Sequence, residues 1–384
     1  CHQTGLVKVV CIGGGGSGAC VTSSVNSLAG RATGGGGGGY SDQIIPVTKG
    51  DTYTITIGAA GQARARTNNA GNGVTQGQVG GASRFVTASG TAIDLNAGGG
   101  GAGAGAVNDS SGSEEGLAGG TGGSASGGST NRVGGAGGAI ASGGGRYGLA
   151  ATGGGAVGIR SPVGYAGGAV VPSSSNNVTR YHSSGGGGIG GAGGALTSSS
   201  VLIQYSATNG GGSSGPGTDD GSGASPISQG VPRMASTTGG TGMIANYGLN
   251  QSNVGSVVET NVGLPTAGAG GVASNGSAGT PNSIFGVFGS GGSYIVSGNS
   301  VKREQGGPGG GGGGNAGDRG GDNSGGIFAG GGGNCTNTSS INVTGIGGPM
   351  GGGSGGAVNS SSGNATASGV AGTGAVVIQY LSLT

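Results

Sequence analysis

Uninterrupted runs of four to six glycines recur along this chain and limit its possible folds more than any other feature. The clearest runs are residues 34–39, 185–188, 309–314 and 330–333, within a total of 112 glycines in 384 residues. Glycine loses more conformational freedom on folding than any other residue, and it disfavours the interior of helices and strands. Neither an α-helix nor an ordinary strand is therefore expected within these runs.

An extended helix with three residues per turn is the conformation that we expect for the runs. Such a helix has no internal hydrogen bonds, so its N–H and C=O groups need partners on neighbouring segments. Side-by-side packing supplies these partners, assisted by Cα–H···O contacts, and requires backbones to approach as closely as only glycine permits. Collagen is excluded because no strict G-X-Y register holds and prolines total only ten. The runs therefore predict a bundle of polyglycine II helices.

Short islands rich in β-branched residues lie between the glycine runs and predict strands. The islands are residues 5–12, 41–62 (a hairpin turning near 49–51), 83–101 (two strands around Ser89 and Gly90), 201–207, 255–264, 283–298 and 374–384. No segment carries the apolar periodicity of a helix. We expect an all-β fold, in which a jelly-roll-like β-sandwich framework carries the polyglycine II bundle and long glycine-rich loops, with essentially no α-helix.

The chain is predicted to form one domain overall, with its first and last strands brought together. Residues 1–105 contain the N-terminal strands of the framework and the first glycine tracts. Residues 106–370 form a glycine-rich body with polyglycine helices and interspersed strands, and residues 371–384 form the closing strand. The near-copies VLIQY (201–205) and VVIQY (376–380) suggest two strands in equivalent places of one sandwich.

Residues 8–20, KVVCIGGGGSGAC, match the G-x-G-x-x-G pattern of dinucleotide-binding proteins. The mechanism of that motif requires a helix after the glycines and an acidic residue about 20 positions later. No helical pattern follows, and the first carboxylate of the chain is Asp42. The match is therefore a consequence of glycine content, and we predict no cofactor.

Residues suited to catalysis or metal binding do not converge in the sequence. The candidate carboxylates lie in Gly/Ser tracts, where they are interpreted as solvated charges: Glu114, Glu115, Asp219, Asp220, Asp318 and Asp322. Residues 317–326 lack the apolar residue of a glycine–aspartate calcium repeat. His182 has no nucleophile or carboxylate nearby in sequence and is predicted to lie on the surface. We therefore predict neither enzymatic activity nor a metal site.

The charge balance and the short apolar runs argue against two classes of partner. Fourteen basic residues face twelve acidic ones, and only Arg64 and Arg66 cluster slightly. Nucleic-acid binding needs a concentrated basic face, so it is not expected. No apolar run reaches the length of about 18 residues that spans a bilayer, so no membrane span is expected.

Cysteines and glycosylation sequons point to an oxidising, extracellular setting. Cys1, Cys11, Cys20 and Cys335 form no C-x-x-C motif, and their even number predicts two disulfides of undetermined pairing. Four buried free thiols are the alternative, and Cys1 is also a candidate for lipidation. The candidate N-glycosylation sites are Asn108, Asn177, Asn250, Asn275, Asn334, Asn337, Asn342, Asn359 and Asn364. A polar surface of small residues explains the same pattern.

Four stretches together resemble the glycine-rich domain of phage tail-fibre and tail-tip proteins. They are VKVVCIGGGGSG, GGGGGGYSDQIIPVTKGDTYTITIGAAGQ, GGASRFVTASGTAIDLNAGGGGAG and GTGAVVIQY, covering roughly residues 5–105 and 370–380. Similar domains occur in extracellular parts of some eukaryotic receptors. The resemblance implies a β-sandwich that carries polyglycine helices and is used outside cells for binding or building.

Two functional hypotheses follow. The first is a non-enzymatic extracellular structural protein, a self-assembling subunit of a surface filament or fibrous appendage that is glycosylated and adhesive. It would form a homo-oligomer or helical polymer, with an exposed strand at residues 5–12 completing a neighbour's sheet. The second is a bacteriophage tail-fibre or tail-tip adhesin that binds a cell-surface or glycan receptor, to which four tyrosines are candidate contributors: Tyr40, Tyr147, Tyr165 and Tyr181. The cysteines and sequons favour the first.

Overall fold

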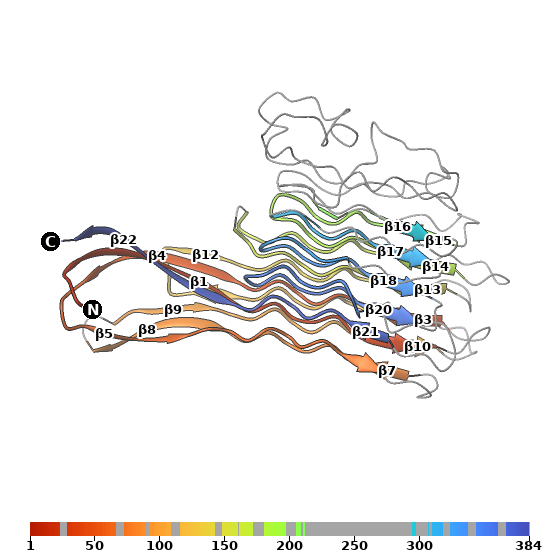
Figure 1. The fold of residues 1–384 in the computed structure, drawn as a ribbon, viewed down its shortest axis with the longest axis horizontal. Helices are drawn as coiled ribbons and strands as arrows, with labels where there is room; N and C mark the ends of the chain where they lie inside the picture. The colour runs from red at the N-terminus through yellow and green to blue at the C-terminus, as the bar shows by residue number, and fades with distance from the viewer. Residues whose placement is uncertain are drawn as a thin grey trace, which may run out of the picture.

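The computed structural model is all-β, and no helix occurs in the residues that it describes. These residues are 1–23, 29–66, 73–89, 92–108, 116–142, 148–159, 161–171, 180–196, 205–208, 210–211, 294–296, 306, 309–317, 323–336, 343–359 and 366–383. Figure 1 shows three regions along the long axis: a β-sandwich that holds both ends of the chain, a central set of undulating segments, and a second group of short strands. The all-β prediction is confirmed.

The sandwich at the left of Figure 1 consists of two four-stranded antiparallel sheets. The first sheet has the order β12 (Thr130–Arg132), β4 (Tyr40–Val47), β1 (Gly5–Ile12) and β22 (Ala375–Leu383). The second sheet has the order β11 (Ala125–Ser126), β9 (Asp94–Ala97), β8 (Ser83–Ser89) and β5 (Thr52–Thr56). As predicted, the first and last strands lie side by side, because β1 pairs with β22 along its whole length.

Alternating side chains of the two sheets form the sandwich core. Val7, Val9 and Cys11 point from β1 toward Phe85 and Leu95 of the second sheet, and all five are buried. This alternation follows from the two-residue period of a strand. Tyr53 stacks on the ring of Phe85, with 4.7 Å between the ring centroids. The islands at residues 5–12, 41–47 and 83–97 therefore supply the core of this sandwich.

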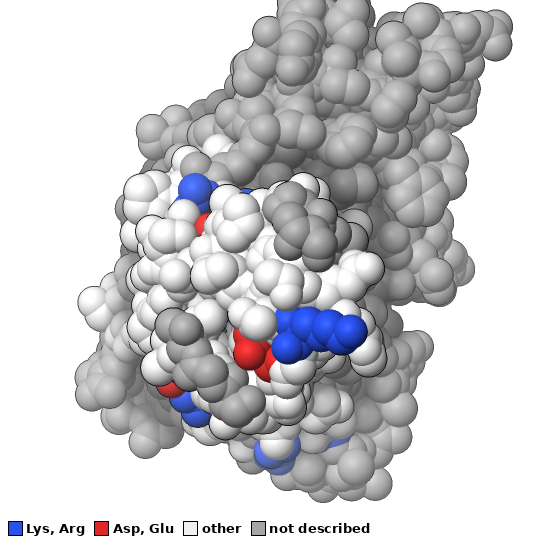
Figure 2. Space-filling model, turned by 90° about the vertical axis from the view of Figure 1, so that its left-hand side faces the viewer, with Lys and Arg blue, Asp and Glu red and all other residues white. Residues whose placement is uncertain are grey.

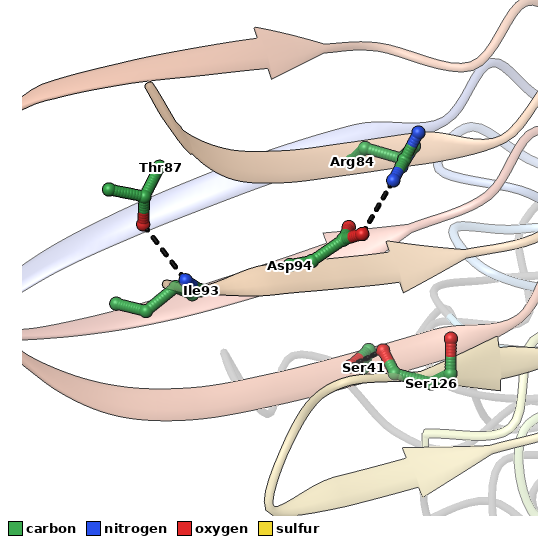
Figure 3. Close-up of polar contacts among 6 residues, drawn as sticks. All are labelled: Ser41, Arg84, Thr87, Ile93, Asp94 and Ser126. Atoms are coloured by element: carbon green, nitrogen blue, oxygen red, sulfur yellow. Dashed lines mark hydrogen bonds and ion pairs between the residues drawn. The ribbon is translucent and has the colours of Figure 1, made fainter. Parts of the chain in front are cut away.

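Polar contacts tie neighbouring strands of the sandwich together (Figure 3). Arg84 of β8 and Asp94 of β9 form an ion pair at 2.6 Å, and the N–H of Ile93 donates to the Thr87 hydroxyl at 3.0 Å. Between the two sheets, the hydroxyl of Ser41 donates to the carbonyl of Ser126 at 3.2 Å. The first two contacts lie within the antiparallel pair of β8 and β9, the hairpin predicted around Ser89 and Gly90.

Hydrogen bonds with a period of three residues connect the central glycine tracts. In the tract 13–19, the N–H groups of residues 13, 16 and 19 donate to the carbonyls of residues 39, 36 and 33. Residues 14 and 17 donate instead to residues 81 and 78, which belong to a different neighbour. A helix with three residues per turn directs successive N–H groups to successive neighbours in this way. The central region therefore has the hydrogen bonding expected of packed polyglycine II helices.

The tracts approach one another too closely for side chains. Gly36 donates to the carbonyl of Gly101 at 2.9 Å and accepts from the N–H of Gly16 at 2.8 Å. A Cβ on Gly36 would lie closer than 3.0 Å to the carbonyl oxygen of Thr121. The Cα hydrogen in that direction therefore points at this oxygen, as in the Cα–H···O contacts that assist such packing. Most glycines of the bundle face a neighbouring backbone in the same way.

Three further sheets lie at the far end of the bundle (Figure 1). The third sheet has the order β10 (Gly105–Asn108), β3 (Ala29–Ala32), β13 (Gly148–Ala151), β14 (Arg180–Ser183) and β15 (Tyr205–Ala207). The fourth has the order β16 (Tyr294–Val296), β17 (Asn315–Gly317), β18 (Asn334–Thr336), β20 (Ala357–Asn359), β2 (Cys20–Thr22) and β7 (Gly73–Thr75). The fifth consists of β19 (Val343–Thr344), β21 (Thr366–Ser368) and β6 (Ala65–Arg66).

The third and fourth sheets face each other across a small core. Val21 and Val358 from the fourth sheet pack against Ala32, Ala151 and Tyr181 from the third. Many of the strand pairs here are parallel, because successive glycine tracts lead into the fourth sheet in the same direction. This end is therefore a second, narrower sandwich attached to the same bundle.

Two of the sequence predictions about strands are wrong in their pairing. The segment 41–62 does form two strands around a turn, but β4 joins the first sheet and β5 the second, so they make no hairpin. The predicted exposed strand, β1, is an interior strand between β4 and β22. β5 instead pairs with β8, where Tyr53 stacks on the buried ring of Phe85.

Other predicted strands are described only in part. Of the island 201–207, the structure describes β15, in the third sheet, while the similar island 376–380 belongs to β22 in the first. Of the island 283–298, it describes β16. The island 255–264 lies outside the described residues.

The substitution Gly36→Ala is expected to lower the free energy of unfolding by at least about 3 kcal/mol, at the upper end of overpacking effects, because a backbone rather than a mobile side chain must yield. Chemical denaturation followed by circular dichroism measures the change. Ala59→Ser, at an exposed alanine of another glycine segment of the bundle, is the control and is expected to change stability by less than about 0.5 kcal/mol. Equal stability of the two variants would contradict the tight packing.

Candidate functional site

A row of buried hydroxyl groups marks where the glycine bundle meets the far end. Each of these residues directly follows a strand of the third sheet: Thr33 follows β3, Thr152 follows β13, Ser184 follows β14 and Thr208 follows β15. All four are almost completely inaccessible to solvent. We refer to these four residues as the hydroxyl row.

Thr152 illustrates what each hydroxyl does. Its Oγ1 accepts the N–H of Gly34 at 3.0 Å and donates to the carbonyl of Gly138 at 2.6 Å. Three residues along the same tract, Gly37 donates directly to the carbonyl of Gly135 at 2.9 Å. At Gly34 the two tracts lie further apart, and the Thr152 hydroxyl replaces the direct N–H···O=C bond that Gly37 makes with Gly135. It bridges the Gly34 N–H and the Gly138 carbonyl.

The same bridge recurs in the next layers. The Ser184 hydroxyl accepts the N–H of Gly153 at 3.4 Å and donates to the carbonyl of Gly168 at 2.5 Å. Thr208 Oγ1 accepts the N–H of Gly185 at 3.3 Å. In each case the donor glycine directly follows the hydroxyl residue of the neighbouring layer. The hydroxyl row thus satisfies backbone groups that the diverging tracts would leave buried and unpaired.

Thr152→Val keeps the shape of the side chain but removes the hydroxyl. We expect a loss of about 2 kcal/mol or more in the free energy of unfolding, because the Gly34 N–H and the Gly138 carbonyl both lose their partner in a buried site. Thr152→Ser retains the hydroxyl and is expected to recover most of the stability. Thermal denaturation of the three proteins measures the difference, and a valine variant as stable as the serine variant would contradict this role.

The strands beyond the hydroxyl row carry polar side chains in their interior. Thr336, Asn359 and Thr22 lie side by side on three neighbouring strands of the fourth sheet, on the face opposite Val21 and Val358. All three polar residues are buried. Arg66 of β6 reaches this row, and its Nε donates to Thr22 Oγ1 at 2.8 Å. This hydrogen bond joins the fourth and fifth sheets.

Two of the predicted glycosylation sites belong to this buried polar layer. Asn334 and Asn359 are each 1% exposed, so neither can carry a glycan in the folded chain. The prediction is therefore wrong for these two sequons, which strand register places in the interior. Asn108 is the last residue of β10. The other predicted sites lie outside the described residues: Asn177, Asn250, Asn275, Asn337, Asn342 and Asn364.

His182 was predicted to lie on the surface, and the structure corrects this. It is 2% exposed, on the central part of the third sheet, in one row with Ala150 and Arg31. Ile140 and Val170 pack against Ala150 and cover that face. Burial lowers the pKa of the Arg31 guanidinium to about 10, and its Nη1 donates to the carbonyl of Ala141 at 3.2 Å. This covering layer could not be predicted from the sequence, because isolated residues such as Ile140 and Val170, rather than whole strands, form it.

The predicted disulfides are not formed, because all four cysteines are free thiols. Cys20 and Cys335 are the nearest pair, but one strand lies between theirs and their side chains point to opposite faces of the fourth sheet. Strands two apart are about 9.6 Å from each other, whereas a disulfide requires Cα atoms within about 7 Å. Cys11 lies about 20 Å further along the chain, beyond the tract 13–19. Cys1 lies beside Gly50, at the other end of β1.

Three of the four thiols are protected from alkylation and oxidation in the folded chain. Burial raises the pKa of Cys11 and of Cys20 to about 12, and it also raises the pKa of Cys335. Cys1 alone is partly exposed. The thiolate is the reactive form of cysteine, so the buried thiols are protonated as well as inaccessible at neutral pH.

Alkylation with iodoacetamide at pH 8 is therefore expected to add one group to the native chain, at Cys1, and four groups after unfolding in guanidinium. Intact-mass spectrometry counts the adducts, and peptide mapping locates them. A Cys1→Ser variant, which should take up no group in its native state, serves as the control. Rapid native labelling at Cys11, Cys20 or Cys335 would contradict the fold.

The remaining candidate residues do not assemble into a reactive centre. Arg64 and Arg66 are held by local contacts, the Nε of Arg64 donating to the carbonyl of Gln76 at 3.0 Å. The Tyr40 hydroxyl donates to Asp42 at 2.6 Å, and that carboxylate pairs with Lys8 at 3.7 Å on the sandwich surface.

The other tyrosines and the candidate carboxylates are scattered or not described. Tyr181 is buried, and Tyr165 is partly buried. The remaining candidates lie outside the described residues: Tyr147, Glu114, Glu115, Asp219, Asp220, Asp318 and Asp322. Within the described ranges, no three histidine, cysteine or carboxylate side chains gather in a way that could hold a metal ion. In the same ranges, no helix is long and apolar enough to cross a membrane.

Comparison with known proteins found no protein-family model and no curated protein that matches this chain. The candidate functional site is therefore defined by geometry alone. It is the far end of the bundle, where strands of the third, fourth and fifth sheets end beyond the hydroxyl row.

Proposed function

We propose that this chain is a non-enzymatic extracellular adhesin, of the kind used on a fibre or a virion tail. In this proposal the glycine bundle holds recognition segments away from the point of attachment. The observation that carries the proposal is the separation of the two ends: β1 and β22 lie in the sandwich, and the strands of the third, fourth and fifth sheets end at the opposite side of the bundle (Figure 1).

The bundle is suited to act as a rigid spacer. A tract such as 13–19 spans about 20 Å at about 3.1 Å per residue, and its N–H groups bond to four different neighbouring segments. Its stability therefore depends on backbone contacts rather than on the sequence of the connections between strands. Such a scaffold tolerates variation in its connections, as binding proteins with variable loops require.

The connections at the far end have a composition that favours recognition by hydrogen bonding. The chain reads NTSSIN between β18 and β19, and SSSGNA between β20 and β21. Serine, asparagine and glycine are also enriched in antibody binding loops, where they supply adaptable polar contacts. Hydroxyl and amide side chains match the donors and acceptors of a glycan, so a surface polysaccharide is the class of receptor that we propose.

We prefer the adhesin over the filament subunit because three features that favoured a filament differ in the structure. The cysteines are free, two clustered sequons are buried, and β1 is not available to complete a neighbour's sheet. The resemblance to phage tail-fibre domains remains a prediction and is consistent with the adhesin.

Replacing residues 337–342 and 360–365 with glycine–serine segments of the same length tests the proposal. The probe is the fluorescently labelled chain, applied to arrays of bacterial surface polysaccharides and to whole bacterial cells. We expect binding to fall at least tenfold while the melting temperature stays within a few degrees. Lys49→Ser, in the turn at the opposite end of the molecule, is the control and should bind as the unmodified chain does.

Two results would overturn the proposal. One is binding that survives replacement of both segments. The other is a chain that binds no cell or polysaccharide but assembles into helical polymers in electron micrographs, which would restore the filament hypothesis.

A further inference from the structure

The two edges of the sandwich differ in length and charge. One edge is formed by β12 and β11, which are three and two residues long, and the guanidinium of Arg132 in β12 lies over the ring of Tyr40. The opposite edge is formed by β22 and β5, with nine and five residues. Short strands and charged side chains are the usual protection against edge-to-edge pairing. Only the first edge has short strands and a charged side chain; at the second, a bulge at Leu381 interrupts the pairing of β22 with β1 near its end.

Strand β22 is an open template for another strand. Its sequence, AVVIQYLSL, contains no charged residue and no proline. It pairs with β1 on one side, and in the described part of the chain no strand pairs with its other side. Alternate residues of an edge strand point their N–H and C=O groups outward, so these groups are available to a partner.

Apolar side chains that face the core layer are uncovered at this edge. Ile378 and Tyr380 pair with Val9 and Val7, so they lie on the same face as these buried residues, yet Tyr380 is 57% exposed. On the second sheet, Ile55 pairs with the buried Phe85 but is itself exposed. The two sheets therefore present open apolar rims along β22 and β5.

We propose that a second copy of this chain docks at this edge, by antiparallel pairing of β22 with its counterpart about a twofold axis through Gln379. In that register, Ile378 of each copy lies opposite Tyr380 of the other, on the core-facing side. Pairs of an aromatic and a β-branched residue are among the favourable cross-strand pairs. The first sheets of the two copies then form one continuous sheet.

The chemistry of the edge favours a second copy over an unrelated partner. An isologous contact needs a surface that is complementary to itself, and the uncharged β22 brings no like charges together. In the same register Val377 lies opposite Leu381, the bulge residue of β22, so the regular part of the self-pairing is centred on Ile378, Gln379 and Tyr380. Figure 2 views this end of the molecule, and uncharged residues dominate the part of it that the structure describes.

The exposed area is sufficient for a modest dimer. The uncovered apolar side chains of this edge are Ile55, Ile57, Val377, Ile378, Tyr380 and Leu381. Covering them in both copies removes on the order of 1,000 Å² of apolar surface, close to the lower limit of about 1,200 Å² for stable interfaces. Backbone hydrogen bonds along β22 add to this contact. The dimer is therefore expected to dissociate on dilution.

Light scattering coupled to size-exclusion chromatography measures the mass of the full chain at several concentrations. We expect a mass near twice 34.6 kDa at high concentration. Val377→Lys places a charge on the edge strand and should weaken association more than tenfold. Ile44→Lys is the matched control, because Ile44 is 54% exposed, against 44% for Val377, but lies on the interior strand β4. It should leave association unchanged.

Cysteine cross-linking tests the register directly. In a Cys1→Ser background, Gln379→Cys places two thiols opposite each other across the axis and should give a disulfide-linked dimer on mild oxidation. Ile44→Cys in the same background should remain monomeric under these conditions. A chain that stays monomeric at every concentration would overturn the proposal, and so would a dimer that persists in Val377→Lys and does not cross-link at position 379.

Discussion

A peptide N–H in a polyglycine helix has no acceptor within its own helix, and the rest of the molecule depends on this fact. Each tract must find its partners on neighbouring tracts, so the helices form only as a bundle. Gly36 shows the requirement at one residue: it donates to Gly101, accepts from Gly16, and leaves no room for a Cβ beside Thr121. Close packing of backbones here replaces the side-chain core that the composition cannot supply.

A bundle of this kind needs defined ends, and the two ends are built differently. At one end the tracts enter a sandwich with a core of large apolar side chains, such as Ile45, Phe85 and Leu95. At the other end the tracts separate, and the hydroxyl row bridges the widening gap through residues such as Thr152. Beyond the row, the strands carry buried polar residues. This difference in construction fits an attached end and a displayed end, which is the basis of the proposed function.

The local features of the fold could be predicted from the sequence because short-range patterns encode them. The island 5–12 forms β1, and the last island forms β22 beside it. The hairpin between β8 and β9 was also predictable, because its two arms stay in one sheet. The crossing from β4 to β5 was not, because the turn at residues 48–51 is compatible with either pairing. Only the shared core decides between a hairpin and a crossing.

The chemistry of individual candidate residues was harder to predict than the strands. Asn334, Asn359 and His182 occur in polar surroundings in the sequence, yet all three are buried. Their burial depends on strands that come from distant parts of the chain and cover them. The same holds for the cysteines, whose even number suggested pairing, although the bundle keeps Cys11 far from Cys20.

By itself, the sequence determined that the chain is all-β and that its glycine runs must pack as extended helices. These conclusions follow from the conformational properties of single residues, which act locally. The tertiary structure alone decided which tracts are neighbours, which strand is an open edge and which polar groups are buried. Those outcomes depend on hydrogen bonds and contacts between segments hundreds of residues apart. Glycine runs of nearly identical sequence contain nothing that specifies which other run each one contacts.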